Sequence, residues 1–221
     1  MLKIEKFVTM SPAQYEIIME GMRNPKNSWE RSDSYITHDC IAETVYDPFS
    51  AFPWFMGDND HKLAKTLADG GPVHAKYRRM MVIYLTVTAP LYWWKEFDTY
   101  KVGTVANSCS TMHKIHEKEF TLDDFSHEHL FPDTKLNLER TISDLNLYRN
   151  LYLNKKDKRH WWQMIQLLPS SYNQKRTVML NYEVLANIYE WRRDHKLDEW
   201  HTFCDWIESL PYSDLITGNK E

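Results

Sequence analysis

The segment from Asp98 to Lys114 has the composition of a ligand-binding loop. It combines small polar side chains with one glycine, Gly103, directly after a short aromatic stretch. Glycine allows the backbone to approach another group closely, and successive backbone N–H groups can surround an anionic or planar ligand. The segment therefore predicts a site for such a ligand, and an ordinary polar connection is the alternative.

Histidines near this segment raise the question of a metal site. Cys109, His113 and His116 lie at helical spacing, and His127 and His129 follow them. Structural zinc sites normally show paired Cys or His ligands at short spacing, and catalytic zinc sites a His-rich helix such as HExxH. Neither pattern is present. A polar helix end is the alternative, and a metal-dependent enzyme built on the first three residues stays as a third hypothesis.

Several functional classes are excluded by what the sequence lacks. It contains no GxxxxGK[ST], no GxGxxG and no GxSxG, so the nucleotide and hydrolase loops with those motifs are absent. The 27 basic and 31 acidic residues give a net charge of -4, which provides no overall positive field for nucleic acid. We therefore expect no nucleic-acid partner.

The sequence also indicates a protein of a reducing, aqueous compartment. No stretch approaches the ~20 apolar residues that a membrane-spanning helix needs, and Glu5 stands where a signal peptide would need an apolar core. Cys40, Cys109 and Cys204 are an odd number at wide spacing, which does not suit a disulfide framework. We expect a cytoplasmic protein with no membrane partner.

Two predicted strands and several predicted helices must position the segment from Asp98 to Lys114. Apolar residues from Met80 to Thr88 predict a strand inside a sheet covered on both sides. Pro90 suits the first turn of a buried aromatic helix over Leu91–Phe97. Without repeats or composition shifts, a single domain over residues 1–221 is expected. Other patterns predict helices over 12–23, 60–69, 136–168 with a break at 155–158, 183–193 and 197–210, a strand over 177–182, and a long loop over 24–53.

The order of these elements and one spacing resemble the flavin-dependent thymidylate synthases. The signature of that family is Arg-His-Arg, seven residues and then Ser, after a strand and a helix that begins with Pro. When Pro90 is aligned, Thr99-Tyr100-Lys101 stands on the Arg-His-Arg and Cys109 stands on the Ser, with the count of seven kept. The spacing of the signature is retained and its residue types are not.

Other parts of the chain resemble the same family more closely. Gly71-Pro72-Val73-His74 is similar to a Glu-His element whose His lies against the flavin. Leu168-Pro169, Asn181, Asn187 and Arg192 have the mutual spacing of the family's Leu-Pro, two Asn and pyrimidine-contacting Arg, and His195 lies close to the position of a flavin-contacting His. These marks together cover about residues 60 to 200.

The resemblance implies an α+β fold and an enzyme. The fold would be a thymidylate synthase-complementing-protein-like domain with a central, mostly antiparallel sheet flanked by helices, assembled as a homotetramer with FAD where subunits meet. The reaction would methylate a small nucleotide, dUMP to dTMP, with methylenetetrahydrofolate and NADPH as co-substrates, while the cofactor carries the redox chemistry. By the same resemblance the flavin contacts would be His74, Tyr100, Lys101, Asn107, Asn181, Asn187 and His195. The nucleotide contacts would be Ser108, Cys109, Ser110 and Arg192, of which Arg192 would be catalytic by donating to the base as negative charge builds on it.

The chain departs from the family in its charges. Thr99 and Thr111 stand where the family has arginines, Lys101 replaces another, and Glu183 replaces a basic residue. Each lost charge-assisted bond to a phosphate is worth about 1.5–3 kcal/mol. The ligand therefore differs, or other arginines supply the charge; the candidates are Arg23, Arg31, Arg78, Arg79 and Arg176. A second hypothesis follows, a non-catalytic or altered-substrate relative that binds a nucleotide or a flavin.

Overall fold

The protein is built on a four-stranded sheet in which every neighbouring pair is antiparallel. The computed structural model describes residues 1–36 and 54–218, so Cys40 and residues 37–53 of the expected loop lie outside the described residues. The strands follow the order β1 (Lys3–Val8), β4 (Val82–Pro90), β6 (Asn173–Asn181) and β5 (Val105–Ser108). A separate pair joins β2 (Tyr35–Ile36) to β3 (Trp54–Phe55). The expected α+β class with an antiparallel sheet is confirmed.

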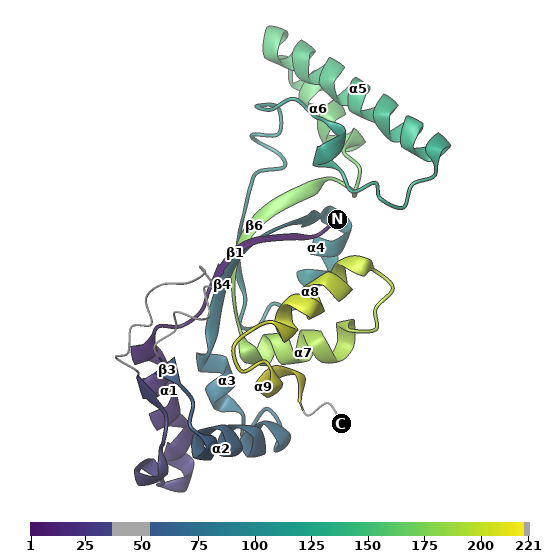
Figure 1. Cartoon of the computed structure of the whole chain (residues 1–221). Helices are drawn as coiled ribbons and strands as arrows, with labels where there is room; N and C mark the ends of the chain where they lie inside the picture. Colours follow the sequence, from purple (N-terminus) through teal and green to yellow (C-terminus); the bar gives the residue numbers. More distant parts are fainter. Residues whose placement is uncertain (37–53, 219–221) are drawn as a thin grey trace, which may run out of the picture.

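The helices form three groups around this sheet (Figure 1). One group lies beside the sheet and consists of α4 (Leu91–Phe97), α7 (Tyr182–Arg192), α8 (Asp198–Glu208) and α9 (Asp214–Thr217). A second group at one end contains α1 (Pro12–Arg23), the short turns η1 (Asn24–Lys26) and η2 (Trp29–Arg31), α2 (Asp58–Asp69) and α3 (Lys76–Met80). At the opposite end η3 (Leu122–Asp124), α5 (Pro132–Lys155) and α6 (Lys158–Leu167) form a projecting arm. None of the helices in the described ranges has the length and apolar character needed to cross a membrane.

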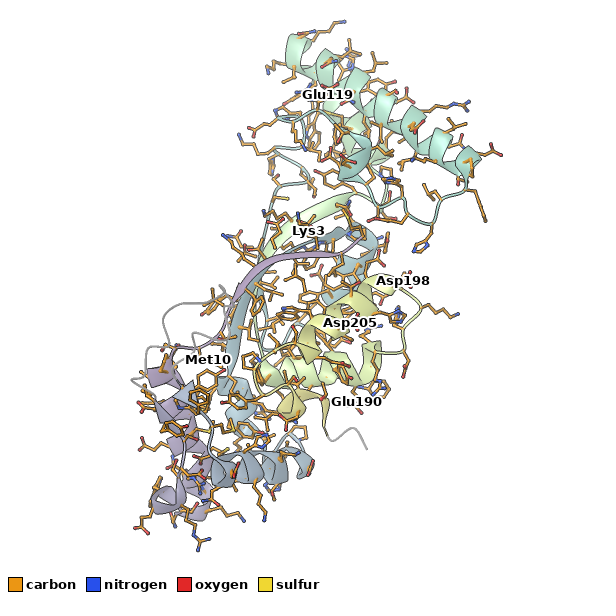
Figure 2. The ribbon with its side chains drawn as sticks, in the orientation of Figure 1. Lys3, Met10, Glu119, Glu190, Asp198 and Asp205 are labelled. Atoms are coloured by element: carbon orange, nitrogen blue, oxygen red, sulfur yellow. The ribbon has the colours of Figure 1, made fainter. Side chains whose placement is uncertain are left out.

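Aromatic side chains fill the space between the sheet and the helices beside it. Trp93 and Trp94 of α4 are fully buried, as the sequence predicted, and Trp200 of α8 packs against Trp93 with ring centroids 4.7 Å apart. Each such ring removes roughly 150–250 Å² from water, so these contacts dominate the core energetically. Figure 2 shows the side chains crowded between the sheet and helices α7 and α8. This packing fixes α8 against α4, and α7 packs against α8 in turn, which matters for the site described below.

On the opposite face of the sheet, no described helix covers the row of side chains at one end of the strands. The register aligns Val8, Tyr84, Met179 and Val105 in one row across the four strands, and Val8, Tyr84 and Val105 are 64%, 53% and 62% exposed. The prediction that the strand from Met80 to Thr88 is covered on both sides is therefore wrong. Every second side chain of β4 points to this face, so its apolar run covers only one side of the sheet.

The arm has a hydrophobic cluster of its own. Leu138, Ile142 and Leu145 of α5 face Met164 of α6, together with Ile115, Phe120 and Phe125. The break expected near 155–158 is confirmed, because Lys156 ends α5 in the left-handed region with φ 53° and Asp157 caps α6. The expectation of a single domain over 1–221 stays a prediction.

Three strands differ from the sequence interpretation. β1 has charged residues at Lys3, Glu5 and Lys6 and was not predicted, because an edge strand carries charges that hide its alternation. β5 lies inside the segment 98–114 that was predicted as a loop. The strand expected over 177–182 begins earlier, at Asn173, and Tyr182 already belongs to α7.

Candidate functional site

The two segments that carry most of the candidate residues meet at Tyr100 and Arg192. Tyr100 follows α4, and Arg192 is the last residue of α7. The Arg192 Nε atom donates a hydrogen bond of 2.9 Å to the Tyr100 hydroxyl, and the guanidinium lies 5.6 Å from the Tyr100 ring centroid and 5.0 Å from that of Trp200. These two rings hold the guanidinium by cation–π attraction as well. Arg192 is thus fixed in position before any ligand arrives.

Glu96 forms the centre of this cluster, and sequence reasoning did not find it. Its Oε2 atom lies 3.0 Å from Arg192 Nη1 and 3.3 Å from His195 Nε2, and it accepts a 3.1 Å hydrogen bond from Trp200 Nε1. A single carboxylate oxygen therefore joins two of the candidate residues. The only signal in the sequence was an acid within a helix of mostly aromatic residues. We call Glu96, Tyr100, Arg192, His195 and Trp200 the Arg192 cluster.

The tautomer of His195 follows from its partners. The backbone N–H of Leu197 donates to His195 Nδ1 at 3.1 Å, so Nδ1 acts as the acceptor. A neutral ring then carries its proton on Nε2, which is the atom facing Glu96. His195 is consequently oriented by its neighbours as firmly as Arg192.

Gly103 brings the turn after Tyr100 against the start of α7. It has φ +82°, and a Cβ atom placed on it would lie 2.9 Å from Asn181 Nδ2 and 3.2 Å from Val184 Cγ2. Only glycine suits both the positive φ and this close approach. Asn181 is buried and its Oδ1 accepts from the Val184 N–H at 3.0 Å, which caps α7. Asn181 therefore has a structural role in the chain, with its amide nitrogen towards the turn.

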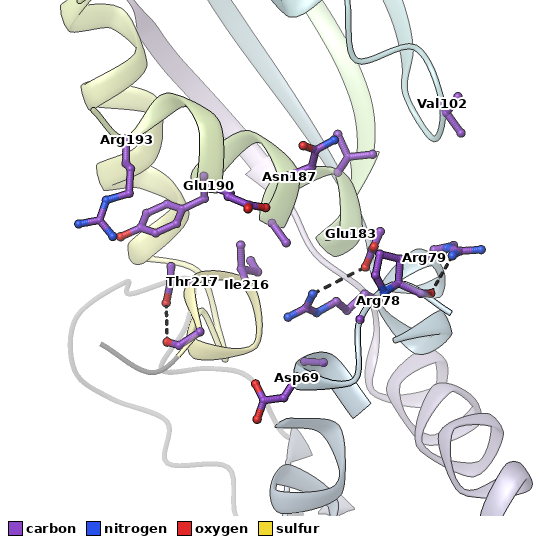
Figure 3. Close-up of a pocket in the computed structure, with 17 residues that line it drawn as sticks. Asp69, Arg78, Arg79, Val102, Glu183, Asn187, Glu190, Arg193, Ile216 and Thr217 are labelled. Carbon is purple, nitrogen blue, oxygen red and sulfur yellow. Dashed lines mark hydrogen bonds and ion pairs between the residues drawn. The ribbon is translucent and has the colours of Figure 1, made fainter. Parts of the chain in front are cut away.

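A large cleft lies on the other side of α7 (Figure 3). Its volume is about 1020 Å³, and its walls come from the end of α2, the 71–72 turn, α3, α7 and α9. Glu183, Asn187 and Glu190 line it at spacings of four and three, which places them on one helix face. Arg192 lies five residues after Asn187, or about 140° around the helix. Within one chain, Asn187 and Arg192 therefore face different sides of α7.

Two buried polar atoms in this cleft lack a hydrogen bond. Arg78 Nη1 and Glu183 Oε2 are 3.7 Å apart, an ion pair that is too long for a hydrogen bond. Arg78 Nε and Glu183 Oε2 have no hydrogen-bond partner among the described residues. Figure 3 shows both side chains between α3 and α7. Since unpaired buried polar atoms are costly, these two favour a polar ligand in the cleft.

The candidates on β5 and directly after it lie away from Asn181 at the start of α7. Asn107 and Ser108 pair with Thr177 and Arg176 of β6, and the Cys109 N–H donates to the Lys175 carbonyl at 2.9 Å. Lys175 is six residues from Asn181, which corresponds to about 20 Å along the strand. Ser110 Oγ accepts from the N–H groups of the following turn. The structure therefore does not bring Cys109 and Ser110 to Asn181 within one chain.

His74 and Lys101 are exposed next to the cleft rather than inside it. His74 lies in the turn before α3 and packs beside Gly70, while neighbouring Gly71 and Pro72 line the cleft. Lys101 adjoins Val102, which lines the opposite wall. Both side chains stand at the rim of the cleft, where another molecule or subunit has access to them.

The alternative arginines are mostly engaged with partners inside the chain. Arg23 pairs with Asp60, Arg78 with Glu183 and Arg176 with Asp98. Arg79 donates to the Pro72 carbonyl at 2.8 Å. Arg31 alone of the five has no ion pair or side-chain hydrogen bond within residues 1–36 and 54–218. The charge missing from the signature is therefore not simply restored by these residues.

The residues considered as metal ligands do not form a site. In the part of the chain that the structure describes, no group of three or more His, Cys, Asp or Glu side chains is placed to hold a metal ion. Cys109 is exposed, and the Nδ1 atom of His116 is buried without a hydrogen-bond partner there. The geometry gives the third hypothesis no support.

The whole chain is similar in fold to solved flavin-dependent thymidylate synthases. The sequence matches no protein-family model and no curated protein. Thymidylate Synthase X from Helicobacter pylori, solved with FAD and dUMP, aligns with 98% of this chain and 96% of its own, at 15% identity and a TM-score of 0.64. A second structure of that enzyme, complexed with FAD and dUMP, aligns over 98% and 97%, at 16% identity and a TM-score of 0.58. At this identity the likeness establishes a fold like that of flavin-dependent thymidylate synthases.

Proposed function

We propose that this chain binds FAD and a uracil deoxynucleotide and acts as a flavin-dependent methyltransferase that converts dUMP to dTMP, with methylenetetrahydrofolate and NADPH as co-substrates. The contact between Tyr100 and Arg192 carries the proposal, because it joins residues 92 positions apart from the two segments that the resemblance assigns to flavin and pyrimidine. The fold shared with enzymes solved with FAD and dUMP supports it.

The residues of the α7 cleft fit a polar cofactor such as FAD. Arg78 Nε is a buried donor that has no acceptor among the described residues, and Asn187 offers both a donor and an acceptor. Arg79 and Arg193 also line the cleft, and the acids Asp69, Glu183 and Glu190 balance the charge of its three arginines. Arg78, Asn187 and Arg193 would hold the cofactor. A bound flavin would supply the hydride-transfer chemistry that no side chain here provides.

Arg192 would orient and polarise the base. Its Nε is bound to Tyr100 and its Nη1 to Glu96, which leaves Nη2 without an acceptor among the described residues. A donor held in this way needs no reorganisation when negative charge builds on a ligand oxygen. The Tyr100 hydroxyl accepts from Arg192 and so keeps its own proton free to donate. Arg192 would bind the base, Tyr100 would hold Arg192 next to the flavin that the resemblance assigns to Tyr100, and Trp200 would exclude water beneath them.

The open face of the sheet supports assembly of several copies. Val8, Tyr84, Met179 and Val105 form an apolar row across all four strands, and surfaces of this kind mark association sites. A homotetramer would also let candidates that point to different sides of α7 contribute to one site through different copies. Sedimentation velocity measures this, and a monomer at micromolar concentration would contradict the proposed assembly.

The decisive experiment is a visible spectrum of the purified protein with and without added FAD. We expect an oxidised-flavin spectrum, an increase in melting temperature with dUMP, and growth of a thymidine-requiring host that carries the gene. Arg192→Ala should abolish that growth, while Arg140→Ala on the exposed arm should not. A colourless protein that ignores FAD, or growth that survives Arg192→Ala, would refute the proposal.

The ion pair between Glu96 and Arg192 favours a second candidate, an altered-substrate or non-catalytic relative. The Glu96 carboxylate already occupies Nη1 of the arginine that would bind the base, and Thr99 and Lys101 replace two arginines of the family signature. Glu96→Gln keeps the shape of this side chain and removes its charge. If wild-type protein binds FAD but not dUMP, and Glu96→Gln gains dUMP binding, the second candidate is supported.

A further inference from the structure

A second polar cavity lies at the end of the molecule formed by α1, the turns η1 and η2, and α2. Its volume is about 780 Å³, which falls within the range of small-molecule sites, roughly 300–1,000 Å³. Four cationic side chains line it, Arg23, Lys26, Arg31 and Lys62, and Glu30 is the one acid among the described residues of its lining. This positive cavity stands out on a chain whose net charge is -4.

Arg23 forms the deepest cationic part of this cavity. It is only 3% exposed, and its Nε donates to Asp60 Oδ1 at 2.5 Å while Nη1 donates to the Ser28 carbonyl at 3.2 Å. Its Nη2 atom is buried and has no hydrogen-bond partner within the described ranges. The guanidinium is therefore held through Nε and Nη1 by Asp60 and Ser28, and its Nη2 is left without an acceptor among the described residues. An anionic oxygen that reaches Arg23 would satisfy it.

The three cations around Arg23 form no ion pair with the described residues. Lys26, Arg31 and Lys62 are exposed, and none of them forms an ion pair with residues 1–36 or 54–218. The chain brings Lys26 and Arg31 together because Asn27 turns it through the left-handed region at φ 44° between η1 and η2. Like charges that share a cavity repel each other, and a bound anion relieves that repulsion.

We propose that this cavity binds the phosphate group of a small molecule, either inorganic phosphate or a phosphomonoester such as a nucleotide. A planar guanidinium with a free edge suits phosphate oxygens, and lysines add point charges around it. The polar side chains of Asn27, Ser28 and Asn59 complete the lining with hydrogen-bonding groups. The cavity is larger than a phosphate ion, so it has space for the group that carries the phosphate. The proposal does not depend on the function proposed for the α7 cleft.

The test is a calorimetric titration of the full chain with inorganic phosphate and, separately, with uridine monophosphate, at constant ionic strength. Saturable binding is expected, and Arg31→Gln and Lys62→Gln should each weaken it about tenfold, because each removes one charge-assisted contact. Lys158→Gln removes an exposed cation on the arm and should leave the affinity unchanged. Arg192→Ala should leave the affinity for inorganic phosphate unchanged, which separates this cavity from the proposed nucleotide site.

The two ligands distinguish the source of the phosphate. The ligand is a phosphomonoester if the nucleotide binds much more tightly than inorganic phosphate and if inorganic phosphate displaces the bound nucleotide. Equal affinities identify the free ion. No saturable binding of either ligand up to about 10 mM would overturn the proposal, as would binding that Arg31→Gln and Lys62→Gln leave intact. Both substituted residues are exposed, so the variants are expected to fold.

Discussion

Replacing Asp60 by Asn should cost more stability than any other single isosteric change near the N-terminal helices. Asp60 is fully buried, and its Oδ1 accepts from Arg23. Its Oδ2 accepts from the Ser32 and Ser34 hydroxyls and from the N–H groups of Asp33 and Ser34, at 2.6–3.2 Å. An Asn side chain has one acceptor oxygen and one NH₂ group. Either Arg23 or the donors that now bind Oδ2 must therefore face that NH₂ group instead of an acceptor.

The expected magnitude follows from the charge that is left behind. Without the carboxylate, the guanidinium of Arg23 stays buried and unpaired, and breaking a buried pair in this way costs about 3–5 kcal/mol. The free energy of unfolding of a whole domain is about 5–15 kcal/mol, so this loss is a large part of it. At about 2–4 °C per kcal/mol, the melting temperature should fall by roughly 10 °C.

The pH dependence gives an independent test of the same carboxylate. Burial alone would raise the pKa of Asp60, but hydrogen bonds from Ser34, Ser32 and Arg23 together hold this pKa below its ordinary value. A carboxyl with a lowered folded-state pKa contributes stability that is fully present above its unfolded pKa, about 3.9, and is lost as pH falls through the folded pKa. The difference between wild type and Asp60→Asn should therefore be constant from neutral pH down to about pH 5 and shrink below about pH 4.

Thermal and urea denaturation measure both effects, with Asp58→Asn as the control. Asp58 lies in the same first turn of α2 and is exposed, so its loss should cost about 0.5 kcal/mol through the helix dipole. The charge-pair explanation is refuted if the free energies of unfolding of Asp60→Asn and Asp58→Asn differ by less than about 1 kcal/mol. It is also refuted if the difference between these two free energies does not change with pH.

Three further predictions concern the turn, the arm and the cysteines. Gly103→Ala should destabilise the protein by about 1–3 kcal/mol more than Gly71→Ala, because both glycines have positive φ but only Gly103 lies in close contact; equal losses in urea denaturation would contradict this. Leu145→Ala removes a fully buried side chain from the arm and should cost about 2–5 kcal/mol, and hydrogen exchange should show the loss in α5 and α6 rather than in the sheet. Burial raises the pKa of Cys204 to about 12, so iodoacetamide at pH 8 should label exposed Cys109 and spare Cys204 in native protein, as read by peptide mass spectrometry.

The helices were predictable where local signals mark their ends. Pro90 precedes α4 and Gly70 follows α2, so the bounds of both helices were close to those in the structure. Strand β5 was not predictable from the sequence. It is an exposed edge strand of four residues that is ordered by hydrogen bonds to β6, which is distant in sequence. The sheet's open face was missed for a related reason, since the apolar run of β4 hides the alternation of Tyr84 and Thr88.

The candidate site was predictable only in part for a comparable reason. The spacing shared with the family indicated Tyr100 and Arg192, but their contact depends on the packing of α4 against α7 and α8. Glu96 has no local signal, because its role arises only where Arg192, His195 and Trp200 converge on one oxygen. Such convergence is a property of tertiary structure and not of sequence spacing.

The charges around the α7 cleft and the Arg192 cluster, rather than their shapes, distinguish the two functions proposed for this chain. The fold aligns over 98% of the chain with enzymes solved with FAD and dUMP, so the likeness of fold does not distinguish the two proposals. The charges do distinguish them, because two arginines already have carboxylate partners: Arg192 is paired with Glu96 and Arg78 with Glu183. A pyrimidine base that binds at Arg192 must compete with a carboxylate already in place, and that competition removes much of the gain from a charge-assisted bond. We infer that neutralising Glu96 should change nucleotide affinity far more than FAD affinity, and equal changes in both would mean that the ion pair only positions Arg192.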